Sequence, residues 1–113
     1  MKALLKRLPK VVRVGPYDFK VELMGSRREI GTGNMGEFSS AEFMIRIAGE
    51  LPSIMLVLDT LLHEICHAIC FAYHIRESDD EERTVSLMGT GWAQVYRDNP
   101  SLLAWIAESA GHA

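Results

Sequence analysis

The sequence lacks several features that would assign it to a specialised class of protein. It contains no internal repeat, no low-complexity tract and no excess of basic residues, since the net charge over 113 residues is −3. Its longest apolar run, within Ile54–Leu62, already contains Asp59 and ends at His63, which is too short to cross a membrane. We therefore expect no nucleic-acid partner and no membrane partner.

An export signal and a disulfide framework are also missing. Residues 1–10 are basic and partly apolar, but they have no uninterrupted apolar core and no cleavage site. The two cysteines, Cys66 and Cys70, lie four residues apart in a predicted helix, where a disulfide is geometrically awkward. We expect free thiols in a reducing cytoplasm. A thiolate could join a metal site on that helix, but we favour two small, buried apolar side chains.

The length and composition predict one domain. A chain of 113 residues, 48% of them hydrophobic, can build a modest core but not the two lobes of a large peptidase. We expect a single domain over residues 1–113, with residues 1–9 and 110–113 as loose termini.

The first half of the chain predicts strands. Residues 10–14 and 17–23 are rich in Val, Phe and Tyr and flank the turn dipeptide Gly15-Pro16, which is typical of a hairpin. Apolar side chains at every second position of residues 43–48 favour another strand. The preceding Ser39-x-x-Glu42 resembles a capping box and would favour a short helix instead.

A glycine pattern between these strands needs a separate interpretation. Gly31-x-Gly33-x-x-Gly36 formally matches a dinucleotide-binding fingerprint. No helix clearly follows it, and 113 residues leave no room for a doubly wound sheet. We interpret these glycines as a loop or hairpin.

The second half of the chain predicts helices. Residues 54–72 are long, mostly apolar and free of Gly and Pro, so we expect a buried helix over residues 51–74. An acidic cluster at residues 77–82 precedes a helix over residues 83–98, whose buried stripe would be Val85, Met88, Trp92 and Val95. A short amphipathic helix over residues 101–109 follows Asn99-Pro100. The predicted fold is α+β, with a small antiparallel or mixed sheet packed on a long helix and two further helices.

The long helix carries the pattern His63-Glu64-x-x-His67. Side chains four residues apart lie on one helix face, so both imidazoles can bind one Zn²⁺ ion. Glu64 follows about 100° further round the helix, where it can act as general base on a water activated by the metal. The alternative is a pair of core histidines that bond to backbone carbonyls, but a buried helix rarely carries such residues unless they are paired or bind a ligand. Asp59, one turn earlier, could orient a histidine or could be solvated.

A catalytic zinc site also needs a third protein ligand. His74 lies about two turns beyond His67, too far along the helix, and His112 lies in the C-terminal tail. The acidic cluster is a better source, and we favour Glu82 over Glu81. Glu82 would share its helix face with small residues that allow close approach, namely Ser86, Gly89 and Ala93. A solvated acidic helix start without any ligand is the alternative.

These motifs resemble a family of small zincin-type metallopeptidases encoded by bacteriophages and prophages. The resemblance rests on Leu61–Ala68, on the acidic residues 79–82 and on Arg97–Pro100, and it covers most of residues 10–105. It implies a zincin-like fold, a Zn²⁺ cofactor and a peptide or protein substrate in the cytoplasm of a bacterial host cell. In that family the later helix carries its ligand within a Glu-x-x-(small or apolar) pattern, which Glu82-Arg83-Thr84-Val85 matches.

The predicted function is a zinc-dependent peptidase. His63, His67 and Glu82 would hold Zn²⁺, and Glu64 would move the proton from water to the leaving amine. Candidates to stabilise the oxyanion are Tyr73, His74 and Tyr96. The alternative is a catalytically silent metal-binding module with a regulatory or interaction role. A homo-oligomer is possible on the ground of small size alone.

Overall fold

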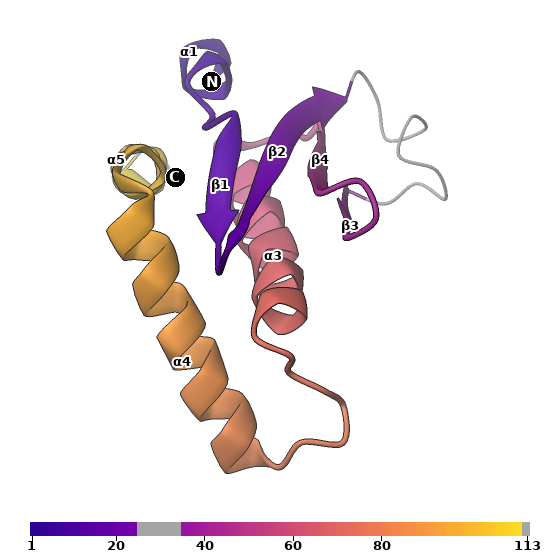
Figure 1. Ribbon diagram of the computed structural model, residues 1–113. Helices are drawn as coiled ribbons and strands as arrows, with labels where there is room; N and C mark the ends of the chain where they lie inside the picture. The colour runs from indigo at the N-terminus through magenta and orange to yellow at the C-terminus, as the bar shows by residue number, and fades with distance from the viewer. Residues whose placement is uncertain (25–34, 112–113) are drawn as a thin grey trace.

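The chain forms an α+β fold in which a four-stranded mixed sheet packs against helices (Figure 1). The computed structural model describes residues 1–24 and 35–111. Along the chain, the elements are α1 (Lys2–Lys6), β1 (Val11–Val14), β2 (Tyr17–Met24), β3 (Gly36–Ser39), β4 (Met44–Ala48), α3 (Ile54–Ala72), α4 (Glu81–Asp98) and α5 (Pro100–Gly111).

The sheet has the strand order β1-β2-β4-β3. The predicted hairpin is confirmed, since β1 and β2 pair antiparallel with Val14 opposite Tyr17. Gly15 in its turn has φ +57°, a conformation that favours glycine, and a Cβ there would lie 3.0 Å from the Cβ of Ala72. The β2–β4 pair is parallel and the β3–β4 pair is antiparallel, so β3 forms one edge of the described sheet.

For residues 39–48 the sequence predicted a strand, with a short helix begun by a capping box as the alternative, and the structure shows a feature of each. Residues 44–48 form the expected strand. The Ser39 hydroxyl accepts a hydrogen bond from the Glu42 N–H at 3.2 Å, as in a capping box, but the bond stabilises the turn over residues 40–43 rather than a helix. Gly36 lies in β3, whereas Gly31 and Gly33 lie outside the described residues.

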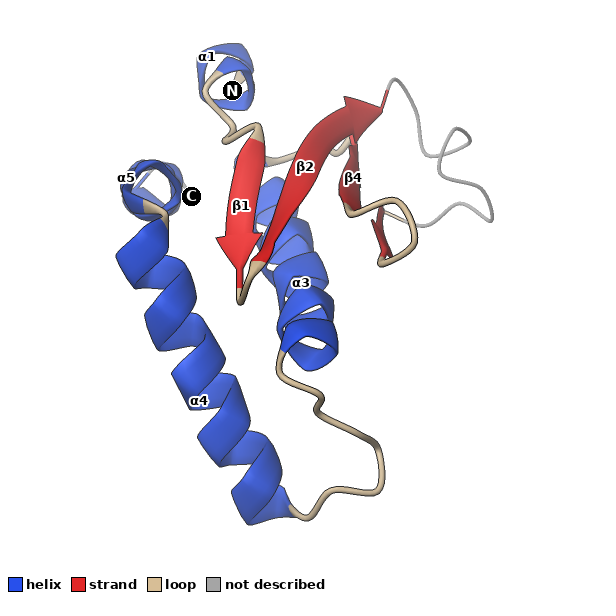
Figure 2. Cartoon of the chain, viewed as in Figure 1, coloured by secondary structure: helices blue, strands red, loops and turns tan. Residues whose placement is uncertain are grey.

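The helix α3 covers one face of the sheet (Figure 2). Ser53 caps its N-terminus, because its side chain accepts a hydrogen bond from the Leu56 N–H at 3.2 Å. Its inner face joins the side chains of the strands in one core, with Leu61, Ile65, Ile69, Phe19, Ile45 and Ile47 fully buried. By length and composition alone α3 could cross a membrane, but a core helix passes the same test, and half of its most apolar window is buried.

The helix α4 packs against β1 and α3, and α5 packs against α3 and α4. The packing of α4 differs from the prediction in one respect. Of the four residues in the expected buried stripe of α4, only Val95 is buried. Met88 and Trp92 are partly covered, and Val85 is 60% exposed. Close contact with α3 occurs instead at Gly91, where a Cβ would lie 2.4 Å from Cγ2 of Ile69. The first two turns of α4 therefore extend beyond the core (Figure 1).

The first residues are not a loose terminus, contrary to the sequence prediction. They form α1, whose Leu4 is buried, and Leu8 beyond it is buried as well. The Trp105 indole N–H donates to the Leu4 carbonyl at 2.8 Å, and Arg7 pairs with Glu108 at 2.6 Å. Apolar burial and these bonds to α5 hold the segment in place. At the other end α5 continues to Gly111, and residues 112–113 lie outside the described part of the chain.

Candidate metal centre

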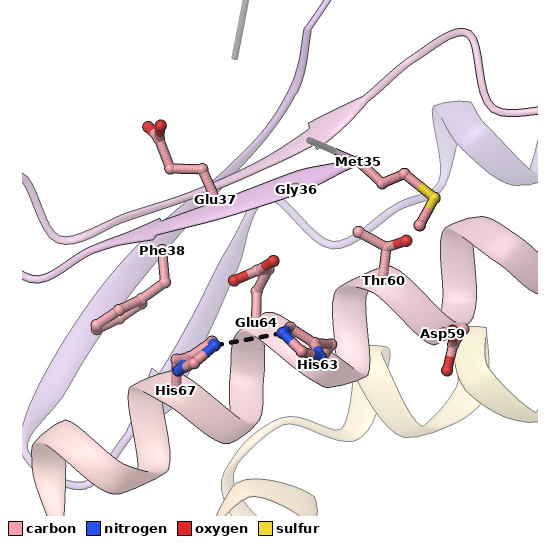
Figure 3. Close-up of a pocket in the computed structure, with 9 residues that line it drawn as sticks. All are labelled: Met35, Gly36, Glu37, Phe38, Asp59, Thr60, His63, Glu64 and His67. Carbon is pink, nitrogen blue, oxygen red and sulfur yellow. Dashed lines mark hydrogen bonds between the residues drawn. The ribbon is translucent and has the colours of Figure 1, made fainter. Parts of the chain in front are cut away.

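Three side chains of α3 converge at the centre of the helix. The Nε2 atoms of His63 and His67 lie 3.3 Å apart, because the two residues are one helical turn apart on the same face. One ligand atom from each of His63, Glu64 and His67 lies within 4.8 Å of the others. Figure 3 shows both imidazoles directed toward one another beside the Glu64 carboxylate. The three positions that the sequence singled out thus converge in space, and the group could bind a metal ion.

The spacing of the two imidazole nitrogens suits two ligands of one metal ion such as Zn²⁺. Two nitrogens bound tetrahedrally to one zinc at about 2.0–2.1 Å would lie roughly 3.3–3.4 Å apart, and the imidazole nitrogens are separated by 3.3 Å. Both histidines are exposed, so an ion could reach them from solvent, whereas Glu64 is only 6% exposed. Two neutral imidazole donors would leave the ion its positive charge, and the Glu64 carboxylate lies beside them.

The three side chains line a groove of about 530 Å³ between α3 and the edge strand β3. The strand side consists of Met35, Gly36, Glu37 and Phe38, and the helix side consists of Asp59, Thr60, His63, Glu64 and His67. The ring of Phe38 stacks on His67 at 6.4 Å between centroids and 18° between planes. The groove thus runs along a strand edge with the candidate ligands on its floor.

Gly36 allows the strand to lie this close to the helix. A Cβ at Gly36 would lie 2.6 Å from Cγ2 of Thr60 and 2.9 Å from Oε2 of Glu64. The position has no room for a side chain, so β3 covers the Glu64 carboxylate directly. Neither Gly36 nor Phe38 was identified from the sequence as a site residue. The signal for Gly36 was present in the glycine pattern, but a contact across 28 positions cannot be deduced from spacing.

Burial sets the electrostatics of Glu64. It raises the pKa of the Glu64 carboxyl, while the nearby His63 and His67 oppose the shift and Glu37 adds to it. Glu37 itself points away from the groove floor (Figure 3) and accepts a bond from Arg46 at 2.7 Å. A raised pKa in the metal-free protein suits a group that exchanges protons, and a bound cation would shift the carboxyl back toward its ionised form.

The structure does not bring Glu82 or Glu81 to the histidines. Both are exposed in the first turn of α4, and neither belongs to the group of converging ligand atoms among the described residues. Glu82 precedes Gly91 by nine residues, two and a half turns at 3.6 residues per turn. Because Gly91 faces α3, Glu82 faces the opposite side. The predicted close approach through Ser86, Gly89 and Ala93 is therefore wrong, since all three are exposed.

The other candidates from the sequence lie around the site without joining it. Asp59 lines the far end of the groove, but its carboxylate points away from the imidazoles (Figure 3). Cys66 and Cys70 are free thiols, as expected, and burial raises the pKa of each, which disfavours the thiolate a metal would need. They are not part of the converging group.

The three oxyanion candidates do not line the groove. The Tyr73 hydroxyl donates to Gln94 at 3.1 Å, the ring of Tyr96 lies 5.4 Å from that of Trp92 on α4, and His74 follows α3 with φ +57°. His112 lies outside the described residues. The described groove thus offers His63, Glu64 and His67 as its groups for metal and proton chemistry.

We compared the chain with protein-family models, with curated proteins and with solved structures, and none of them matched. The resemblance to phage-encoded zincin-type peptidases therefore stays a prediction from the motifs.

Proposed function

We propose that the protein is a zinc-dependent hydrolase of peptide bonds with a zincin-like site. The observation that carries this proposal is the convergence of His63, His67 and Glu64 on one point of a solvent-open groove. His63 and His67 would hold the ion through their Nε2 atoms. Bound Zn²⁺ supplies a Lewis acid that polarises a carbonyl and lowers the pKa of a water toward about 7.

Glu64 is assigned the proton transfers. Its carboxylate is buried beneath β3 within 4.8 Å of the imidazole nitrogens, close enough to receive a proton from a water between them. As the water oxygen bonds to the carbonyl carbon, Glu64 takes the proton. It then delivers the proton to the amine nitrogen as the carbon–nitrogen bond breaks.

The edge strand supports a peptide as the substrate. β3 pairs with β4 on one side only within the described sheet, and its other side borders the groove. An extended peptide can add to such an edge through backbone hydrogen bonds. A bound peptide would then pass over the histidines with a carbonyl near the ion.

The first test is metal binding by the protein after treatment with a chelator. We expect one Zn²⁺ per chain by calorimetric titration, with binding lost in His63→Ala and in His67→Ala. Glu82→Ala is the matched control, because Glu82 lies on an exposed helix start away from the site and should not change the affinity. Equal zinc binding by the wild type and His63→Ala would contradict the proposal.

The variant Glu64→Gln tests whether Glu64 acts as the general base or as a metal ligand. If Glu64 is the base, the variant keeps its zinc affinity within about threefold and loses at least about 10²-fold in cleavage rate, the usual contribution of a general base. Cleavage can be followed by mass spectrometry on a mixed peptide library. Loss of zinc binding in Glu64→Gln would instead make the carboxylate a ligand.

The alternative is a metal-binding module without turnover. It is favoured by the absence of any third ligand in the converging group of the described residues other than Glu64 itself. This alternative predicts zinc uptake by the wild type but no cleavage of any peptide in the library.

A further inference from the structure

An aromatic cluster continues from the His67 end of the groove. All four phenylalanines of the chain belong to it, together with one tyrosine: Tyr17, Phe19, Phe38, Phe43 and Phe71. The centroids of the contacting rings lie 5.3–6.4 Å apart, which is the range of favourable aromatic pairs. Phe19 is fully buried, but Phe43 is 39% exposed and Phe71 is 37% exposed. The cluster is thus part core and part surface.

The surface part is continuous with the candidate metal centre. Phe38 lines the groove and stacks on His67 on one side, and its ring lies 6.2 Å from that of Phe71 on the other. Phe71 in turn lies 6.4 Å from Phe43. We call Phe38, Phe43 and Phe71 the aromatic patch. It begins beside a candidate zinc ligand, because Phe38 lies at the end of the groove opposite Asp59 and Met35 (Figure 3), and it continues to the partly exposed Phe71 and Phe43.

The backbone at Phe43 is strained. Its φ is +51°, a left-handed conformation that bulky L-residues rarely adopt. Glycine or asparagine would be easier to place in this turn. Contacts with Tyr17 and Phe19 offset part of the cost, yet more than a third of the side chain remains in solvent. Strained residues of this kind concentrate at binding sites.

Strand geometry determines what can reach the patch. Phe38 faces α3, whereas its neighbour Glu37 bonds to Arg46 on the other face of the sheet. A peptide added along the edge of β3 would continue this alternation, so every second side chain would face α3. The side chain next to a carbonyl held at His63 and His67 would then lie against Phe38 and Phe71.

We propose that the aromatic patch binds a large apolar side chain, preferably aromatic, of the peptide adjacent to the bond that is cleaved. This inference rests on the proposed function and names its substrate class. Apolar contact areas of this kind discriminate between side chains by about 10- to 200-fold. Because the patch carries no charged group of its own, it gives no compensation for burying an acidic side chain.

The test is calorimetric titration of the zinc-loaded protein with the hydroxamates of phenylalanine, alanine and glutamate, whose hydroxamate group binds the metal. We expect the phenylalanine compound to bind at least about tenfold more tightly than the alanine compound, and the glutamate compound to bind no better than alanine. In Phe71→Ala and Phe43→Ala the preference for phenylalanine should fall to about threefold or less, with zinc affinity unchanged. Leu103→Ala, on α5, is the control, since Leu103 is 45% exposed but lies outside the groove.

The outcomes separate this inference from the proposed function. If the zinc-loaded wild type bound the phenylalanine and alanine compounds with equal affinity, the proposed role of the aromatic patch would be wrong, but the proposed metal site would stand. Failure to take up zinc at all would overturn both. The wild-type comparison does not depend on how well any variant folds, and unchanged zinc affinity shows that the two phenylalanine variants retain α3.

Discussion

At the scale of single residues, Asp98 links the end of α4 to the hairpin through Gln94. Its carboxylate accepts bonds from Arg97 at 2.8 Å and from Gln94 at 3.1 Å. The bond from Arg97 is the main cause that lowers the Asp98 pKa to about 2, and the bond from Gln94 adds to it. Gln94 also donates to the Arg13 carbonyl and accepts from the Gly15 N–H, so it fixes the β1–β2 turn.

This lowered pKa predicts a dependence of stability on acid. The folded protein binds the Asp98 proton less readily than the unfolded chain, so the contribution of Asp98 is complete above about pH 4. It is lost as the pH falls to about 2. We expect the difference in unfolding free energy between wild type and Asp98→Asn to shrink between pH 4 and pH 2, measured by urea denaturation.

Arg97→Ala provides the reciprocal check. In an Arg97→Ala background the effect of Asp98→Asn should be smaller and should depend less on pH, since the main cause of the shift is absent. A wild-type to Asp98→Asn difference that stays constant from pH 6 to pH 2 would contradict the assignment.

The convergence of side chains could be predicted from the sequence where the relation is local. His63, Glu64 and His67 lie within five positions on one helix, so helical geometry alone fixes which of them converge. The stacking of Phe38 on His67 and the contact of Gly36 with Glu64 depend on where β3 lies, and no spacing rule contains that information.

At the scale of elements, two glycines of α4 give a matched comparison. A Cβ at Gly91 would lie 2.4 Å from Cγ2 of the fully buried Ile69, whereas a Cβ at Gly89 would meet nothing within 4 Å. We expect Gly91→Ala to lower the unfolding free energy by about 1–3 kcal/mol, as overpacking does. Gly89→Ala should raise it by up to about 1 kcal/mol through helix propensity. Urea denaturation measures both, and equal stabilities of the two variants would show that α4 does not cross α3 at Gly91.

The crossing of α4 over α3 at Gly91 explains why Glu82, the predicted third ligand, does not lie near the histidines. The sequence suggested a close approach of the helices along Ser86, Gly89 and Ala93, because small residues allow it. The structure uses Gly91, and the side chains that fix α4 against β1 are polar. Asn99 accepts the Arg13 N–H and donates to the Arg13 carbonyl, both at 2.8 Å. Such long-range bonds rotate the face of α4 that carries Glu82 away from the histidines.

At the scale of the whole molecule, the sequence predicted most of the elements and the β1–β2 hairpin, but not α1 or the pairing of β4 with β2 and β3. Periodicity identified the hairpin, the strand at residues 44–48 and the three C-terminal helices. β2 pairs in parallel with β4, and β3 pairs antiparallel with the other side of β4. This strand order places β3 at the edge of the described sheet, so the groove results from topology rather than from any motif.

Because the candidate ligands lie on the helix at the centre of the core, metal binding should stabilise the whole fold. An ion that binds only the folded chain adds about 2.7 kcal/mol at a free concentration of 100 times its Kd. For a chain of 113 residues we expect this to raise Tm by roughly 10 °C. Differential scanning calorimetry with zinc and with a chelator measures the shift, which should vanish in His67→Ala. Zinc can also bind the thiols of the unfolded chain and reduce the shift, so a Cys66→Ser, Cys70→Ser background serves as the control. If His67→Ala gained the same shift, zinc would be acting at another site, and α3 would be a core helix without a metal.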